Sequence, residues 1–165
     1  MKIKTLCPTL IALLGLAAAA RAETLPDTIR APDATAFLTL HAEGAQIYQC
    51  KAGADGKLVW TFREPIAALM RDGATVGRHF AGPSWQLNDG GRVQGKVAGK
   101  APGATAADAP WLKLEVFARE GGGLLSEATV IQRLHTSGGA LEGACEADGV
   151  LRSIPYSADY VFLKK

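Results

Sequence analysis

Short apolar runs with a two-residue period, separated by glycine-rich turns, limit most strongly what this chain can fold into. Within residues 111–118, Leu112 and Leu114 alternate with Lys113 and Glu115. Such alternation is typical of a β-strand with one buried face, because successive side chains point to opposite sides of the sheet. Many of the 19 glycines fall between such runs, where turns favour them.

The same pattern recurs along most of the chain. Strands are expected at residues 37–42, 45–51, 57–63, 75–80, 92–98, 111–118, 129–136, 150–154 and 156–163, with a short extended piece at 84–87. About eight or nine short strands at these turn spacings predict an all-β fold, a single-domain antiparallel sandwich or barrel.

At most one short helix is expected. Pro65 precedes the alanine-rich residues 66–70, and proline at a first helical position favours one or two helical turns there. Just before it, Leu58, Trp60 and Phe62 share one strand face and are expected in the core.

The domain organisation follows from composition. Residues 23–35 are polar, carry two prolines and are expected to form a flexible N-terminal arm. Residues 36–165 are expected to form the single all-β domain, and residues 99–110, rich in Ala, Gly and Pro, a mobile loop within it.

The N-terminus has the pattern of a secretory signal peptide at residues 1–22. Lys2 and Lys4 precede an apolar stretch, and Ala20-Arg21-Ala22 is a small-x-small cleavage signal. The stretch is about half the ~20 residues that a membrane span needs, so no membrane span is expected. The chain is therefore predicted to be exported, periplasmic or extracellular.

Removing the signal peptide changes the charge balance. Three of the 18 basic residues leave and all 16 acidic residues stay, so the formal charge falls from +2 to −1. This balance argues against a nucleic-acid partner, which a basic surface would attract.

Two of the three cysteines remain after cleavage. Cys50 and Cys145 would then meet an oxidising compartment, where paired cysteines form disulfides. A Cys50–Cys145 disulfide is the preferred interpretation, with two free thiols as its alternative.

Residues 76–91 contain the densest group of candidate site residues. His79 with Asp89 could form a histidine–carboxylate pair, the minimal general base, and Tyr48 is a further catalytic candidate. The structural alternative makes His79 a histidine bonded to a loop carbonyl and Asp89 a turn former. Ser84 does not complete a nucleophile elbow, because the second glycine of that motif is missing.

Arginine and aromatic side chains suggest ligand binding instead. Arg78, His79 and Trp85 are the ligand-binding candidates, with Trp85 equally compatible with the core or a surface. Arg78, Arg92 and Arg133 could bind an anion through the planar guanidinium. The simpler interpretation pairs a buried arginine, Arg78 in particular, with an acid such as Glu64 or Asp159.

No metal or cofactor is expected. His41, His79 and His135 are the only histidines, they fall on separate predicted strands, and no metal-binding spacing joins them. No dinucleotide-binding glycine motif lies between a strand and a helix.

Several segments resemble, in order, the domain-of-unknown-function family 3455, exported proteins of bacteria and fungi. They are GAQIYQC at residues 44–50, WTF at 60–62, VGRHFAGPSW at 76–85, DG at 89–90, IQRLHTSGG at 131–139 and PYSADYVF at 155–162. The resemblance covers about residues 35–163. It implies export and a single domain, and it assigns no catalytic residue.

These observations predict an exported binding or structural envelope module, more readily than an enzyme. Its expected partner is a small molecule or a cell-envelope component. The alternative is a small hydrolase or lyase that uses His79 with Asp89 or Tyr48.

Overall fold

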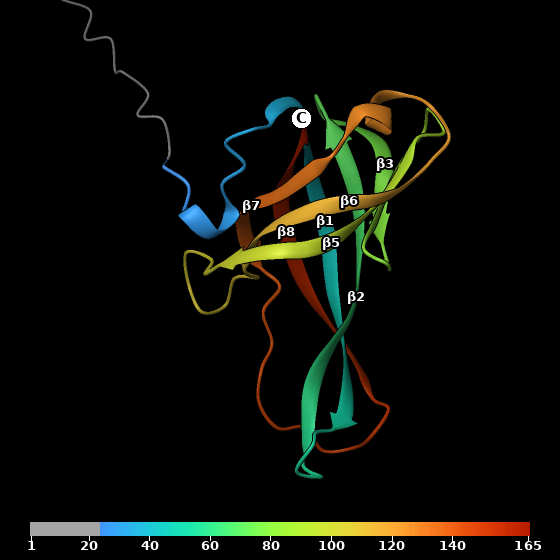
Figure 1. The fold of residues 1–165 in the computed structure, drawn as a ribbon. Helices are drawn as coiled ribbons and strands as arrows, with labels where there is room; N and C mark the ends of the chain where they lie inside the picture. Colours follow the sequence, from blue (N-terminus) through green and yellow to red (C-terminus); the bar gives the residue numbers. More distant parts are fainter. Residues whose placement is uncertain (1–23) are drawn as a thin grey trace, which may run out of the picture.

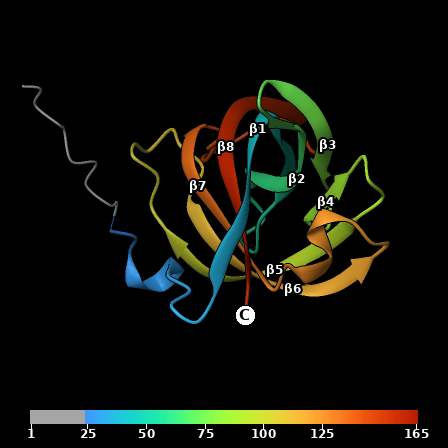
Figure 2. The ribbon, with the colours of Figure 1, turned by 90° about the horizontal axis from the view of Figure 1, so that it is seen from above.

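The computed structural model describes residues 24–165, in which eight antiparallel strands close into a barrel (Figure 1 and Figure 2). The strands are β1 (Thr35–Ala52), β2 (Leu58–Arg71), β3 (Ala74–Phe80), β4 (Ser84–Leu87), β5 (Arg92–Ala101), β6 (Trp111–Glu120), β7 (Val130–Gly138) and β8 (Leu151–Lys164). Each pairs with the next along the chain, and β8 pairs with β1. The all-β prediction is confirmed, with a barrel as its form. The signal peptide predicted at residues 1–22 lies outside the described residues.

Fewer, longer strands form than the local pattern indicates. β1 runs continuously through Gly44, where a Cβ atom would lie 2.0 Å from the Ile66 carbonyl oxygen. Only glycine therefore lets β2 pass this close. β8 likewise continues through Pro155. Two pairs of predicted strands thus become two single strands that cross the whole barrel.

The helix predicted at residues 66–70 is wrong, because these residues belong to β2. Ala67 and Leu69 face the interior while Ile66 faces outward, which is a two-residue period. Pro65 is tolerated because it pairs with β1 only, since the pairing of β2 with β3 begins beyond it at Ala67. Asp72 and Gly73, both with positive φ, then make a two-residue hairpin turn to β3.

The β1–β2 hairpin projects beyond the rest of the barrel (Figure 1). Its tip therefore lacks an interior, and the core predicted around Leu58, Trp60 and Phe62 is wrong for this reason. Phe62 is 49% exposed, and Trp60 is half-buried with the Arg152 guanidinium 5.1 Å from its ring centroid.

A disulfide joins Cys50 of β1 to Cys145, with a Cα–Cα distance of 5.8 Å, as predicted. Cys145 belongs to the 139–150 loop, which runs along the projecting hairpin. Backbone hydrogen bonds from Trp60 N to Gly143 O and from Cys145 N to Leu58 O hold the two together. The disulfide thus fastens a long connection to the barrel.

The segment predicted as a loosely attached arm lies against the barrel wall. Ile29, in a short 3-10 turn (Asp27–Ile29), is fully buried with Ala101 and Leu134, and its carbonyl accepts a 2.7 Å hydrogen bond from Gln132 Nε2. Part of the predicted mobile loop also has defined contacts. Residues 99–101 belong to β5, and Asp108 accepts a 2.6 Å hydrogen bond from Gly138 N.

The main core fills one end of the barrel. Its largest fully buried side chains come from separate strands, among them Leu40, Leu69, Trp85, Leu114 and Phe162. The other end of the interior is only partly filled, and this position holds the candidate site.

No helix among residues 24–165 is long and apolar enough to cross a membrane.

Candidate functional site

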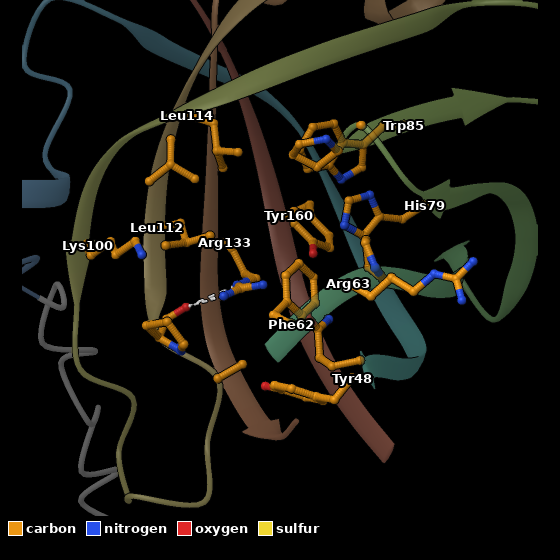
Figure 3. Close-up of a pocket in the computed structure, with 17 residues that line it drawn as sticks. Tyr48, Phe62, Arg63, His79, Trp85, Lys100, Leu112, Leu114, Arg133 and Tyr160 are labelled. Carbon is orange, nitrogen blue, oxygen red and sulfur yellow. Dashed lines mark hydrogen bonds between the residues drawn. The ribbon is translucent and has the colours of Figure 1, made fainter. Parts of the chain in front are cut away.

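A cavity of about 470 Å³ occupies the partly filled end of the barrel (Figure 3). Most of its lining is apolar or aromatic, and its polar groups come from strands distant in sequence. The lining residues are Gln46, Tyr48, Phe62, Arg63, Pro65, His79, Gly82, Pro83, Trp85, Val97, Lys100, Ala109, Pro110, Leu112, Leu114, Arg133 and Tyr160. Gly95 lets the Trp85 ring close one end, because a Cβ there would lie 3.2 Å from that ring.

His79 reaches the cavity from β3 and is 2% exposed. Its Nδ1 lies 2.8 Å from the Ser84 carbonyl oxygen, so Nδ1 carries the proton and donates, which leaves Nε2 as an acceptor. Burial lowers the pKa of His79 to about 3, outweighing the hydrogen bond to Ser84, which raises it. The imidazole is therefore neutral across the physiological range.

Trp85 of β4 lies directly opposite His79 in the sheet, and their rings stack with centroids 4.5 Å apart. Trp85 is 1% exposed, and its Nε1 donor has no hydrogen-bond partner among the described residues. The Tyr160 ring lies 4.8 Å from His79 and 5.3 Å from Trp85. Three aromatic rings thus form one wall of the cavity.

Arg133 enters from β7 and is 7% exposed. Its Nε and Nη2 both donate to the Pro110 carbonyl oxygen, at 3.0 and 2.8 Å (Figure 3). No carboxylate among residues 24–165 pairs with this guanidinium. Burial has the larger effect on the nearby groups: it raises the pKa of Tyr48 and Tyr160 and lowers that of His79. The positive charge of Arg133 lowers all three pKa values, so it opposes burial at the tyrosines and adds to it at His79.

The tyrosine hydroxyls of the site are neutral. Tyr48 donates to the Gly139 carbonyl oxygen at 2.8 Å, and burial raises its pKa. The hydroxyls of Tyr156 and Tyr160 lie 3.3 Å apart, and burial raises the pKa of both. Because their pKa values are raised, none of these three hydroxyls is ionised near neutral pH, so none can act as a base there.

The structure does not bring His79 and Asp89 together. The Asp89 carboxylate accepts hydrogen bonds from Gly91 N at 2.9 Å and Leu124 N at 2.8 Å, which is a structural role in two loops. Ser84 Oγ donates to the Ala81 carbonyl oxygen at 2.9 Å. Among the described residues, therefore, neither Asp89 nor the Ser84 hydroxyl pairs with His79 as a general base would require.

Arg78 lies on the outer face of β3, away from His79 and Trp85. It shares the face of Val76 and Phe80 as the alternation indicates, but that face is exposed at Arg78, while Val76 farther along the strand packs partly against the main core. Its guanidinium bonds Gln86 Oε1 at 3.1 and 2.8 Å and lies over the Phe80 ring, so the expected pairing with Glu64 or Asp159 is wrong.

The two other histidines meet outside the cavity. His41 Nδ1 and His135 Nδ1 lie 2.8 and 2.9 Å from the two carboxylate oxygens of Asp159. Burial opposes ionisation of Asp159, but these imidazoles hold its pKa below the ordinary value. Within residues 24–165 no group of three or more His, Cys, Asp or Glu side chains is placed to hold a metal ion.

Sequence reasoning singled out His79 and Trp85, and it named Arg133 only as one of three arginines that could bind an anion, without placing it at the site. The available signal was the alternation in β7, where Arg133 shares a face with Ile131 and so points inward. Gln46 and Pro110 carried no signal, because only closure of the barrel brings them to the cavity.

The sequence matches the model of one family, described as Protein of unknown function (DUF3455), over residues 31–75 and 71–164. These segments cover nearly all of the barrel, so the chain belongs to this family, and the resemblance is confirmed. No curated protein and no solved structure matches the chain.

Proposed function

We propose that this member of the DUF3455 family is an exported binding module that holds one small organic molecule inside its barrel. The observation that carries the proposal is the cavity of about 470 Å³ in a closed eight-stranded barrel. Ligand sites commonly have volumes of about 300–1,000 Å³, and barrels of about eight strands can enclose one small ligand.

The lining supports binding through apolar contact. Trp85, Leu112, Leu114 and Tyr160 present buried apolar surface, and a few polar groups remain to orient a ligand. Burial of apolar ligand area contributes roughly 25 cal/mol per Å², so such walls can hold a compact apolar body.

The geometry favours binding over the hydrolase or lyase alternative. The pKa of His79, about 3, makes it a poor base at neutral pH, and Asp89 is engaged in two loops. Neither Asp nor Glu occurs among the described residues that line the cavity, so none serves in its place. Export is supported by the signal pattern at residues 1–22 and by the disulfide, which is typical of oxidising compartments.

The test uses N-phenyl-1-naphthylamine, a neutral dye that fluoresces in apolar surroundings. Wild-type protein should bind it with one-to-one saturation. Leu112→Trp fills the cavity and should abolish binding, whereas Phe117→Trp, on the same strand but 62% exposed, should leave it unchanged. Thermal melts establish that both variants are folded.

Two results would count against this function. Equal dye binding by both variants would place the dye outside the barrel. Absence of binding by the wild-type protein to the dye and to a panel of sugars and organic acids would favour a structural envelope role.

A further inference from the structure

A cation buried without a counter-charge is the most unusual group in the barrel. Arg133 is 7% exposed, its two hydrogen bonds of defined length go to the neutral Pro110 oxygen, and its other partner is the neutral Tyr160 side chain. Burying an ionised group is costly unless it is paired, so proteins seldom keep such a group unpaired in the interior. The fold alone therefore does not explain why this guanidinium is buried without a counter-charge.

Within residues 24–165, the cavity lining around Arg133 contains no compensating acid. Among the 17 lining residues there are three basic side chains and neither Asp nor Glu. Arg63 pairs with Glu64 at 3.1 Å and points away from the other labelled side chains (Figure 3), and Lys100 is exposed. Glu142 adds to the effect of burial in raising the pKa of Tyr48, but it does not line the cavity. The interior of the cavity is consequently positive.

A second buried donor, Trp85 Nε1, independently indicates that the cavity binds a ligand with hydrogen-bond acceptors. Trp85 Nε1 is buried in the same lining and has no acceptor among residues 24–165. A buried donor left without an acceptor costs about 1–3 kcal/mol. Two strands distant in sequence thus supply buried donors to the cavity lining: the Arg133 guanidinium lacks a counter-charge, and Trp85 Nε1 lacks an acceptor. Acceptor atoms of a ligand would satisfy such groups.

The geometry of the guanidinium suits a carboxylate. Nε and Nη2 bond Pro110 along one edge and the Tyr160 side chain is a further partner, so the guanidinium N–H groups beyond these are left for a ligand. Arginine binds carboxylates through two parallel N–H groups, and such charge-assisted bonds are about twice as strong as neutral ones. The bond to Pro110 also holds the guanidinium in place before a ligand arrives, which lowers the entropic cost of binding.

We infer, on the basis of the binding function proposed above, that the ligand is a small organic carboxylate with an apolar body, held by Arg133 inside the barrel. The ring wall of His79, Trp85 and Tyr160 contacts the body. An aromatic acid and a fatty acid share this chemistry. The cavity of about 470 Å³ has room for an aromatic acid or a fatty acid only if the molecule is compact.

Isothermal titration calorimetry with 2-naphthoate and 2-naphthamide tests the inference, because the two have nearly the same shape and differ in charge. Wild-type protein should bind the carboxylate at least 10-fold more tightly, the low end for a hydrogen bond to a charged group. Decanoate and decanol form a second pair that distinguishes an aliphatic from an aromatic body.

Variants identify the residue responsible. Arg133→Met should reduce the preference for 2-naphthoate to less than twofold while N-phenyl-1-naphthylamine still binds. Arg133→Lys keeps the charge and should keep part of the preference. Arg71→Met, the same change at an exposed arginine that pairs with Asp72 and does not line the cavity, should leave it within about twofold.

The outcomes separate the inference from the function. If the neutral dye binds inside the barrel but naphthoate and naphthamide bind equally, or neither binds, the anion inference is wrong and the binding function stands. If neither the dye nor any probe binds, both fail. Should Arg133→Met not fold, equal binding of the two naphthalene probes to the wild-type protein would still overturn the inference.

Discussion

The disulfide offers the sharpest quantitative prediction. Replacing Cys50 and Cys145 together by alanine removes a link that joins residues 95 apart in sequence. In the native protein the 139–150 loop keeps its hydrogen bonds to the β1–β2 hairpin, including Gly149 N to Cys50 O at 2.9 Å. The main effect should therefore fall on the unfolded chain, which gains freedom when the link is lost.

The size of this effect follows from the length of the closed loop. Chain-entropy models assign about 4.7 kcal/mol to a loop of ~100 residues, and this loop is nearly that long. We expect the free energy of unfolding to fall by about 4 kcal/mol. The melting temperature should fall on the order of 10 °C for a chain of this size.

Urea unfolding followed by circular dichroism measures the change. The double alanine variant is compared with wild type and with Glu146→Ala, an exposed change in the same loop that should lie within about 0.5 kcal/mol of wild type. A loss of less than about 1 kcal/mol in the double variant would refute the loop-closure reasoning. Such a result would mean that the unfolded chain is already constrained there without the link.

Three further predictions concern the barrel wall and the site. Burial lowers the pKa of His79 to about 3, so below pH 6.5 its imidazole is protonated in the unfolded chain but stays neutral in the folded protein. The free energy of unfolding should therefore fall as the pH drops from 6.5 toward 3, by about 2 kcal/mol between pH 7 and pH 5. His79→Asn should lose this component in urea melts at both pH values, and an unchanged slope would contradict the assignment. Gly44→Ala should cost more than about 2 kcal/mol, since its Cβ would collide with β2, whereas Gly122→Ala, with open space around it, should be nearly neutral in the same melts. Asp89→Ala should lose about 1–3 kcal/mol of stability and leave dye affinity unchanged, and a loss of affinity would restore a role for Asp89 at the site.

Several strands could be located closely from sequence. The extended piece at Ser84–Leu87 coincides with β4, and the strand predicted at residues 111–118 lies within β6. Where the pattern was ambiguous the interpretation failed, as at residues 66–70. Alanine is compatible with a helix, and pairing with β1 and β3 decided otherwise.

The candidate site was predictable only in part. His79 and Trp85 were singled out because they lie in one dense motif, and they do stack in the cavity. Arg78 was selected for the same reason and lies on the outer face. A motif gathers residues along the chain, but adjacent residues of a strand point to opposite sides, so at most half of such a motif can reach one site.

The sequence by itself determined the all-β class and the cysteine pair, because alternation and cysteine count are local or compositional properties. Only the tertiary structure decided that the sheet closes into a barrel, that one end stays partly empty, and that Arg133 lies buried in that end without an acid. These features depend on the register of strands far apart in sequence, since pairing of β8 with β1 sets which side chains meet inside.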